Sequence, residues 1–285
     1  MFDYNETLEQ ARQRNIHDAL MEDFGIADWT AKLVPDKRVS AQLLVRQEAI
    51  LCGVDWFEGT LKKLDPSAMV IWHYMEGDVM QADTKVCDIQ SDSRAILSAE
   101  RPAINFLQTL SWTATVTRQY VDAISGISPN PNGCAVLDTR KTIPGLRQAQ
   151  KYAVRVGHGK NQRLALWDGI LIKENHIAAA GSITAAIKSA LDLEAGVSIQ
   201  IEVENLIELQ EALEAGAKNI LIDNFSVKQM KEAVALNNGR ALLEASGGIS
   251  LDQMRTIAAT GIDRISLGIL TKDIHAVDFS MRIAG

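Results

Sequence analysis

The chain has 285 residues, of which 47% are hydrophobic and 23% are charged, and its formal net charge at pH 7 is −7. This composition is typical of a globular protein and excludes collagenous, coiled-coil and disordered chains. The length fits two domains or one large α/β barrel. The negative net charge argues against a general nucleic-acid binder, although it leaves room for a local basic pocket.

The cysteines and the apolar stretches indicate the compartment. Cys52, Cys87 and Cys134 lie far apart and form no C-x-x-C pair. Their odd number and spacing argue against a disulfide scaffold or a zinc ribbon and favour a reducing, cytoplasmic setting. The first residues are polar, without the apolar core of a signal peptide, and no apolar stretch approaches the length of a membrane span.

The first third of the chain predicts mixed α and β structure. Residues 5–25 have apolar positions at helical spacing and end at a glycine. Residues 38–53 and 67–77 are rich in Val, Ile and aromatic residues and predict strands, and residues 84–92 predict a weaker one. A long helical pattern follows over residues 94–124.

Turn formers cluster at residues 125–133, and the texture then changes to short apolar runs that alternate with amphipathic segments. The predicted helices in this part include 206–216, 226–239 and 250–261, each closed by a glycine. From residue 198 on, the strands recur about every 22 residues, the rhythm of a parallel sheet that closes as a barrel. The predicted strands are residues 134–138, 168–173, 198–203, 219–223, 241–246 and 263–268.

Ionisable residues and glycines gather at the carboxyl ends of these six strands. The C-terminal rim of a βα barrel is where loops and helix N-termini converge, so we expect the functional site there. The alternative is that these charges simply end the strands where they meet solvent. That explanation suits any single residue but not ionisable residues or glycines at all six strand ends. The set is Asp138-Thr139-Arg140-Lys141, Lys173-Glu174-Asn175, Glu202, Asp223-Asn224, Ser246-Gly247-Gly248 and Gly268.

The small residues predict a phosphate site. Ser246-Gly247-Gly248 precedes a helix, and Gly268 ends the next strand, so backbone N–H groups can approach an anion there. Glycines in ordinary tight turns are the alternative.

The acids Glu202 and Asp223 end neighbouring strands. One hypothesis is a magnesium site completed by a substrate phosphate. A second is electrostatic stabilisation of a cationic, sugar-like transition state. A third is a purely structural pair of hydrogen-bonded acids.

The cations predict a multiply anionic small substrate. Four of them fall on or just beyond the first two strands of the barrel, and Arg101 lies in the earlier long helix. Arginine forks suit planar carboxylates and phosphates. His176, just past a lysine of the rim, is expected to orient that loop, and a catalytic role is the alternative. The four cations are Arg140, Lys141, Arg163 and Lys173.

Several motifs in their order along the chain resemble those of the quinolinate phosphoribosyltransferase family. They are DTRKTIPGLR, NQRLAL, LIKENHI, IEVENL, LIDNF, EASGGIS and SLGILT, preceded by EDFGIADWT and ERPAINFLQTLSWTAT. The resemblance covers essentially the whole chain. It implies an α/β fold with an N-terminal α/β sandwich-like domain and a C-terminal open α/β barrel of the type II phosphoribosyltransferase kind. The domains would be residues 1–112, joined by residues 272–285, and residues 113–271.

The resemblance also implies an activity and an assembly. A pentosyltransferase of this family joins quinolinate to 5-phosphoribosyl 1-pyrophosphate with Mg²⁺, yielding nicotinate mononucleotide, pyrophosphate and CO₂ for NAD biosynthesis. It implies a homodimer with shared active sites, in which the N-terminal domain of one subunit covers the barrel of the other. No nucleic-acid or membrane partner is expected.

Roles carry over motif by motif. Lys141, Lys173, Glu202 and Asp223 would be catalytic, with Glu202 and Asp223 facing the ribose and Mg²⁺, either directly or through substrate-bound metal. The remaining residues would bind the carboxylates and phosphates of the substrates. They are Arg101, Thr139, Arg140, Gln162, Arg163, Ser246, Gly247, Gly248, Leu267, Gly268 and Ile269.

Two positions depart from the family pattern. Many members carry histidine directly before the arginine of the loop, where this chain has Gln162, which can donate a hydrogen bond but carries no charge. Ala27 stands where a glycine is usual, and we expect it to affect only a turn. Two rivals share the fold: a paralogue associated with molybdate transport, and a non-catalytic sensor of a phosphate ligand. Neither needs so full a set of cations.

Overall fold

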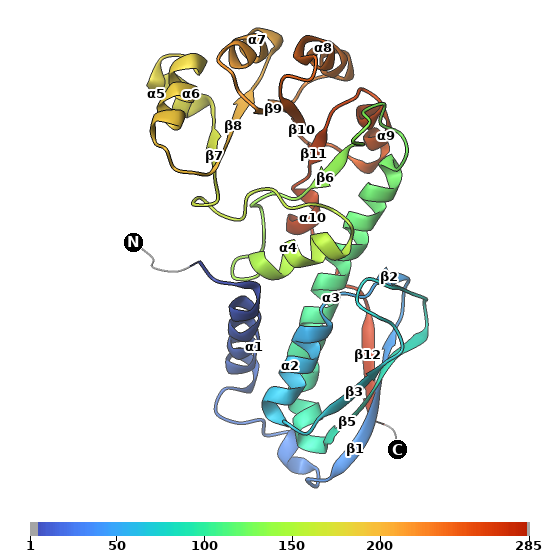
Figure 1. Cartoon of the computed structure of the whole chain (residues 1–285). Coiled ribbons are helices and arrows are strands. Elements are labelled where there is room, and N and C mark those ends of the chain that lie inside the picture. Colours follow the sequence, from blue (N-terminus) through green and yellow to red (C-terminus); the bar gives the residue numbers. More distant parts are fainter. Residues whose placement is uncertain (1–4, 284–285) are drawn as a thin grey trace. The chain divides into compact units, whose positions relative to one another are not determined.

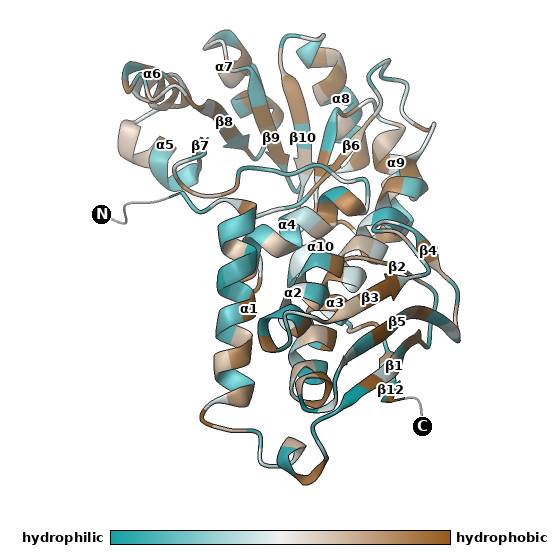
Figure 2. Ribbon diagram, turned by 60° about the horizontal axis from the view of Figure 1, so that its bottom comes forward, coloured by the Kyte–Doolittle hydropathy of each residue, from teal (hydrophilic) through white to brown (hydrophobic). Residues whose placement is uncertain are grey.

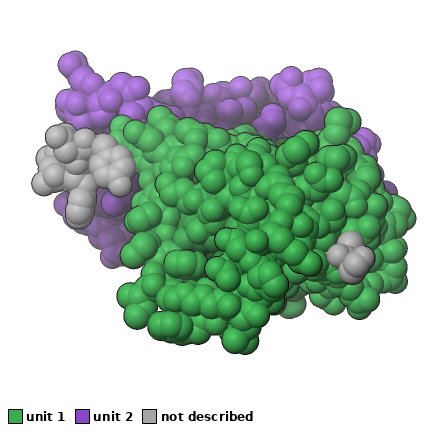
Figure 3. All heavy atoms as spheres, turned by 90° about the horizontal axis from the view of Figure 1, so that it is seen from below, with its two compact units in different colours: residues 1–116, 142–158, 270–285 green, residues 117–141, 159–269 purple. Residues whose placement is uncertain are grey.

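The structure is a computed structural model that describes residues 5–283. Contacts within the chain define two compact units, which Figure 3 distinguishes by colour. Unit 1 contains residues 1–116, 142–158 and 270–285, and unit 2 contains residues 117–141 and 159–269. Each unit is therefore assembled from stretches that are separated in the sequence. No helix in the described part of the chain is both long and apolar enough to cross a membrane.

Unit 1 combines helices with a four-stranded antiparallel sheet of order β12-β1-β5-β3 and a separate β2-β4 pair (Figure 1). The predicted first helix is confirmed, and Thr7 begins it with a capping box shared with Gln10. The elements are α1 (Leu8–Phe24), a 3₁₀ turn (Ala31–Leu33), β1 (Arg38–Val45), β2 (Ala49–Ile50), α2 (Val54–Leu64), β3 (Met69–Trp72), β4 (Val79–Met80), β5 (Thr84–Asp92), α3 (Ser93–Ile124, which continues into unit 2), α4 (Arg147–Val156) and β12 (Phe279–Ile283).

Two features of unit 1 differ from the sequence prediction. The stretch 38–53 is not one strand, because the polar residues 46–48 separate β1 from β2. Helix α2 follows directly and has no counterpart in the prediction, where Gly59 weakens its helical pattern. A Cβ atom at Gly59 would lie 2.5 Å from Ile16 Cδ1 of α1, so the glycine allows these helices to pack closely.

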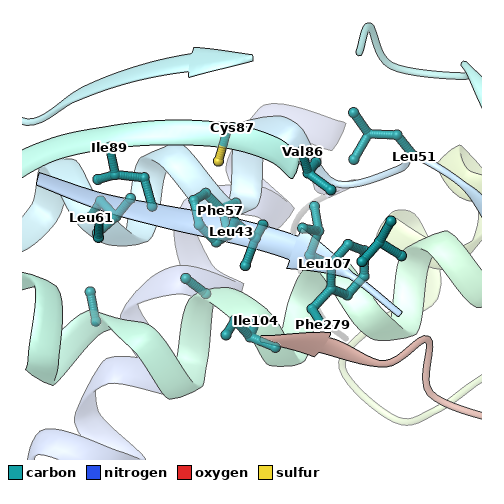
Figure 4. Packing of buried hydrophobic residues seen from close by; sticks show 14 of the residues in the cluster. Leu43, Leu51, Phe57, Leu61, Val86, Cys87, Ile89, Ile104, Leu107 and Phe279 are labelled. Atoms are coloured by element: carbon teal, nitrogen blue, oxygen red, sulfur yellow. The ribbon is translucent and has the colours of Figure 1, made fainter. Parts of the chain in front are cut away.

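The core of unit 1 lies between the antiparallel sheet and the helices. Leu43 of β1, Phe57 of α2, Leu107 of α3 and Phe279 of β12 meet there, and each is less than a tenth exposed (Figure 4). Burial of such side chains contributes about 1.5–3 kcal/mol each. Because Phe279 comes from the far end of the chain, the C-terminal strand is part of this core.

A buried carboxylate joins α2 to the sheet. Asp65 accepts hydrogen bonds from Ser67 Oγ (2.6 Å), Ser91 Oγ (2.6 Å), Asp92 N (3.1 Å) and Arg38 Nη1 (2.8 Å). Burial by itself raises the pKa of this carboxyl, but the hydrogen bonds outweigh burial and hold the pKa well below its ordinary value.

We expect Asp65→Asn to lower the free energy of unfolding at pH 7 by roughly 2 kcal/mol, because hydrogen bonds to a buried charge are lost. A carboxyl whose pKa is depressed on folding stabilises the protein above its unfolded pKa, near 4, and this stabilisation is lost as the pH falls below that value. Urea unfolding from pH 7 to pH 3 should therefore show a difference from wild type that shrinks in acid. Asp83→Asn, at an exposed ion pair with Arg46, is the matched control. Equal losses in both variants would contradict the prediction.

Unit 2 is a six-stranded parallel sheet with helices along its outer side (Figure 1). All six strands predicted for the second part of the chain are confirmed. The elements are β6 (Ala135–Leu137), β7 (Gly169–Ile172), α5 (Glu174–Ala180), α6 (Ile183–Asp192), β8 (Ser198–Val203), α7 (Leu206–Glu214), β9 (Asn219–Asp223), α8 (Val227–Asn237), β10 (Leu242–Ser246), a 3₁₀ turn (Leu251–Gln253), α9 (Met254–Ala258), β11 (Arg264–Ser266) and α10 (Ile269–Lys272, which continues into unit 1).

The strand order β6-β11-β10-β9-β8-β7 makes the barrel open. The strands β6 and β7 follow one another in the sequence but occupy the two ends of the sheet. Strands β8 and β10 are largely hydrophobic in Figure 2. Their apolar residues alternate with polar ones, so one face of the sheet packs against helices and the other is polar.

Candidate active site

The polar face of the parallel sheet is the inside of the open barrel. Gln200 of β8 and Glu244 of β10 are hydrogen-bonded at 2.9 Å, although β9 lies between their strands. Two strands with one between them are about 9.6 Å apart, so such side chains meet only on a concave face. The predicted rim residues on these strands occupy the same face, nearer the carboxyl ends.

An ion pair joins the carboxyl ends of β7 and β8 at one side of the rim. Lys173 Nζ lies 3.1 Å from Glu202 Oε2, and the Glu202 side chain is only 13% exposed. The register pairs Glu202 with Leu221, so Asp223 stands two residues further along on the same face. Asp223 in turn pairs with Ser246 of β10. The structure thus brings together four predicted residues from four adjacent strands.

The cationic side of the rim is built by the ends of β6 and a segment that runs beside it. Residues Leu137 and Lys160 form a parallel bridge, and Asp138, fully buried, accepts hydrogen bonds from Asn161 Nδ2 (2.6 Å) and Gln162 N (2.8 Å). These contacts fix the segment that carries Arg163.

The arginines of the two segments act on each other. Burial and the nearby Arg140 guanidinium both lower the pKa of Arg163 from its ordinary value. Arg163 Nη1 donates to the carbonyl of Gly169 at 3.0 Å, and Thr139 Oγ1 accepts from Lys141 N at 3.1 Å. Two like charges held close together form a site that favours an anionic ligand.

The structure places the side chain of Gln162 among the polar residues inside the barrel. Its side chain points into the barrel: Nε2 donates to Gln200 Oε1 (2.7 Å) and to Glu244 Oε1 and Oε2 (3.1 and 3.2 Å). Its Oε1 accepts from the backbone N–H of Arg163 at 2.6 Å. The role of this side chain as a direct substrate ligand stays a prediction.

The glycine turn after β10 has the backbone that the phosphate hypothesis needs. Gly247 and Gly248 have φ values of +113° and +55°. A Cβ atom at Gly247 would lie 2.2 Å from Asn224 Oδ1, so a larger residue would displace that side chain. The helix predicted after this turn is broken into a 3₁₀ turn and the five-residue α9. Leu267 and Gly268 follow β11, and Ile269 begins α10.

The structure also places His176 and Arg101, the two remaining residues that the sequence pointed to. His176 Nδ1 accepts a hydrogen bond from Lys173 N at 3.0 Å, so it orients the start of α5 as expected. Arg101 lies in unit 1, on α3, with its side chain exposed. Within residues 5–283 its guanidinium makes no hydrogen bond or ion pair.

The inside of the barrel contains polar residues that the sequence interpretation did not single out. Glu244 is fully buried, Gln200 is 8% exposed, and Arg264 Nε lies 3.6 Å from Glu244 Oε2. Arg264 Nη2 also donates to Asn219 Oδ1 at 3.2 Å. A signal was present, since a charged residue in the middle of an apolar parallel strand is unusual.

The acids of the rim suit a metal that arrives with a substrate. Among residues 5–283, no three His, Cys, Asp or Glu side chains come together as a metal site. Glu202 is already paired with Lys173, and Asp223 Oδ2 accepts from Asn224 Nδ2 at 2.7 Å. Mg²⁺ is commonly held by one or two carboxylates together with phosphates and water. The donor set therefore fits Mg²⁺ bound mainly by substrate phosphates.

An open α/β barrel with clustered cations, paired acids and a glycine turn at its C-terminal rim defines a class of enzyme that acts on small, multiply anionic, phosphate-bearing substrates. Within that class, the chain belongs to the quinolinate phosphoribosyltransferase family. The family's N-terminal domain matches residues 28–111, and its C-terminal domain matches residues 113–282.

Individual relatives agree with this assignment. A probable nicotinate-nucleotide pyrophosphorylase (carboxylating) of Bacillus subtilis is 37% identical over 266 residues, which cover 92% of this chain and 90% of the relative. A mitochondrial quinolinate phosphoribosyltransferase (decarboxylating) of Nicotiana tabacum is 36% identical over 93% of this chain and 80% of its own length. The solved structure of the nicotinate-nucleotide pyrophosphorylase from Francisella tularensis has a TM-score of 0.93 and 40% identity, covering 100% of both chains.

Proposed function

We propose that this protein is a decarboxylating quinolinate phosphoribosyltransferase that joins quinolinate to 5-phosphoribosyl 1-pyrophosphate. The products are nicotinate mononucleotide, pyrophosphate and CO₂, which places the reaction in the synthesis of NAD. The observation that carries the proposal is the Lys173–Glu202 ion pair, set among the rim cations of an open barrel from this family. The fold and site match this activity better than the molybdate-associated paralogue or the non-catalytic sensor, because neither of these needs cations that bind both carboxylates of a dicarboxylic acid.

The acids act on the sugar in this proposal. As pyrophosphate departs, positive charge develops on the ribose, and the carboxylates of Glu202 and Asp223, at the carboxyl ends of β8 and β9, stabilise that charge. Lys173 keeps Glu202 oriented through their 3.1 Å contact. The turn at Ser246-Gly247-Gly248, with Leu267-Gly268-Ile269, holds the 5-phosphate through backbone N–H groups.

The cations act on the pyridine substrate. Arg140, Lys141, Arg163 and Lys173 bind its carboxylates and bring two mutually repelling anions into alignment. Once the ring nitrogen is joined to the sugar, the positive charge on that nitrogen stabilises the electron pair left on the neighbouring ring carbon when its carboxylate departs as CO₂, and a proton from water then replaces the carboxylate on that carbon. The protein therefore supplies alignment and charge compensation, and the ring nitrogen supplies the charge that stabilises the carbanion.

Magnesium belongs to the proposal as an ion that enters with phosphoribosyl pyrophosphate. Glu202 and Asp223 would contact it directly or through water, in keeping with their position and with the metal's preference for phosphate oxygens. When bound, Mg²⁺ neutralises charge on the leaving pyrophosphate.

We also propose a homodimer with shared active sites. Arg101 is exposed on α3 and makes no hydrogen bond or ion pair within residues 5–283, as expected of a group that acts on another subunit. Residues 1–112 with residues 272–285 would form the domain that meets the partner's barrel of residues 113–271. Pairing of β12 with β1 supports joining the C-terminal segment to the first domain. The three free cysteines are consistent with a cytoplasmic location.

A direct assay tests the proposed activity. Purified protein mixed with quinolinate, phosphoribosyl pyrophosphate and Mg²⁺ should form nicotinate mononucleotide and CO₂ in equal amounts, as measured by chromatography and by release of label from the carboxylate beside the ring nitrogen. Omission of Mg²⁺ is the control. Binding of phosphoribosyl pyrophosphate without any product would favour the sensor, and product from a different base would favour the paralogue.

A further inference from the structure

The buried carboxylate of Glu244 determines how two amides inside the barrel are oriented. Its two carboxyl oxygens accept hydrogen bonds from the NH₂ groups of Gln162 and Gln200, at 3.1 and 2.9 Å, so both amides turn their nitrogens toward it. The second N–H of Gln162 is then used by Gln200 Oε1 at 2.7 Å. With Glu244 fully buried, water cannot replace these partners.

The orientation of Gln162 in turn fixes the backbone that carries Arg163. With its NH₂ held inward, Gln162 directs Oε1 at the backbone N–H of Arg163, which donates to it at 2.6 Å. The backbone N–H of Gln162 is tied to Asp138 at 2.8 Å. Two consecutive backbone N–H groups are thus held: that of Gln162 by the buried carboxylate of Asp138, and that of Arg163 by the side chain of Gln162.

Arg163 needs such an anchor because its neighbour repels it. Burial and the charge of Arg140 both lower the pKa of Arg163, and within residues 5–283 its guanidinium donates a single hydrogen bond, to the carbonyl of Gly169 at 3.0 Å. With so few side-chain bonds of its own, the position of the guanidinium depends on how the backbone of Arg163 is held. The residues that hold this backbone through Gln162 are Gln200 and Glu244, which lie inside the barrel, below the rim.

We propose that Glu244 and Gln200 are positioning residues which, through Gln162, hold Arg163 in place to receive a dianionic substrate. This inference rests on the proposed function for its substrate, and it assigns Gln162 to the support of Arg163 in place of direct substrate contact. It also gives Glu244, which touches no substrate, a measurable effect on substrate affinity.

The first test needs no substrate. Hydrogen–deuterium exchange of the ligand-free protein should show faster exchange in the segment 159–168 for Glu244→Gln and for Gln162→Ala, because an amide at position 244 leaves one NH₂ group without an acceptor. The matched control is Asp263→Asn, whose carboxylate accepts from Asn130 Nδ2 (2.7 Å) and Leu243 N (2.8 Å) at the opposite end of the same sheet. Unchanged exchange in both test variants would overturn the proposal.

The second test separates positioning from general damage. Glu244→Gln should raise the KM for quinolinate roughly tenfold, the effect of about one such hydrogen bond to a charged group. The KM for phosphoribosyl pyrophosphate and kcat should change less than about twofold, and Asp263→Asn should change neither KM. Equal rises in both KM values, or a fall in kcat alone, would contradict a role through Arg163.

A double variant identifies the route. If Glu244 acts through Gln162, the KM of Gln162→Ala should rise little further when Glu244→Gln is added, since both changes break one connection. If instead the KM increase of the double variant equals the product of the two single increases, Glu244 acts by a route that does not pass through Gln162. Should the wild-type protein not use quinolinate at all, the proposed function fails, while the exchange experiment still decides whether the network holds the segment. Gln162→Ala, at a half-buried position, keeps the test available if Glu244→Gln does not fold.

Discussion

Quinolinate is expected to react at least roughly a thousandfold better than nicotinate, judged by kcat/KM. Nicotinate lacks the carboxylate beside the ring nitrogen, so cations that the site has placed for that group stay unpaired in its complex. A site built to pair with a polar group rejects the analogue lacking it by about 10⁴–10⁵. The closeness of Arg140 and Arg163, which lowers the pKa of Arg163, makes an unpaired complex especially unfavourable.

Steady-state rates with each pyridine acid at saturating phosphoribosyl pyrophosphate provide the measurement. Arg163→Ala is the informative variant, because it should lose most of its rate with quinolinate while its low rate with nicotinate changes little. Comparable turnover of the two acids by the wild-type protein would rule out the dicarboxylate clamp and point to a different phosphoribosyltransferase.

Arg101→Ala and Lys173→Ala should each be nearly inactive as pure proteins, yet active again when combined. In the proposed dimer, each site takes Arg101 from one chain and Lys173 and Glu202 from the other, as the isologous arrangement of a two-fold dimer permits. A mixed dimer therefore collects both substitutions in one site and leaves the other intact. Unfolding and refolding an equal mixture makes half of the dimers mixed, each with one intact site of two, so roughly a quarter of the wild-type activity should return.

The matched control combines two changes in the barrel. Arg163→Ala and Lys173→Ala both lie in unit 2, so a mixed dimer of these variants has a substitution in each site and should recover nothing. Mixed dimers are verified by a mass label on one partner. If Arg101→Ala with Lys173→Ala also recovers nothing although mixed dimers form, Arg101 acts within its own chain.

Much of the barrel and its rim could be predicted from the sequence because the determinants are local. Short apolar runs, spaced about 22 residues apart in the later part of the chain, predict parallel strands, and all six are present in one sheet. In a parallel sheet the carboxyl ends of the strands share one edge. Lys173, Glu202, Asp223 and Ser246 therefore come together from strand order alone, as their register and ion pair show.

Other features were decided only by tertiary structure. Strand β12 pairs with β1 across more than two hundred residues, and no local pattern near residue 279 predicts this, since the expectation that residues 272–285 join the first domain came from the family resemblance. Helix α2 contains Gly59, which weakens its local pattern but permits contact with Ile16. Local sequence patterns predict neither the β12–β1 pairing nor the Gly59–Ile16 contact, because each depends on a partner distant in the chain.

The clearest case is Gln162. From the sequence it is a neutral residue beside an arginine of the rim, and a role as a substrate ligand follows naturally from its neighbours. The folded barrel places Gln200 and Glu244 beneath it, on strands separated by β9, and their buried polar groups require its amide. The sequence by itself determined which residues stand at the rim, because that depends on strand ends. Which way a side chain at the rim turns depends on the hydrogen-bonding groups below it, and the curvature of the folded sheet brings those groups within reach.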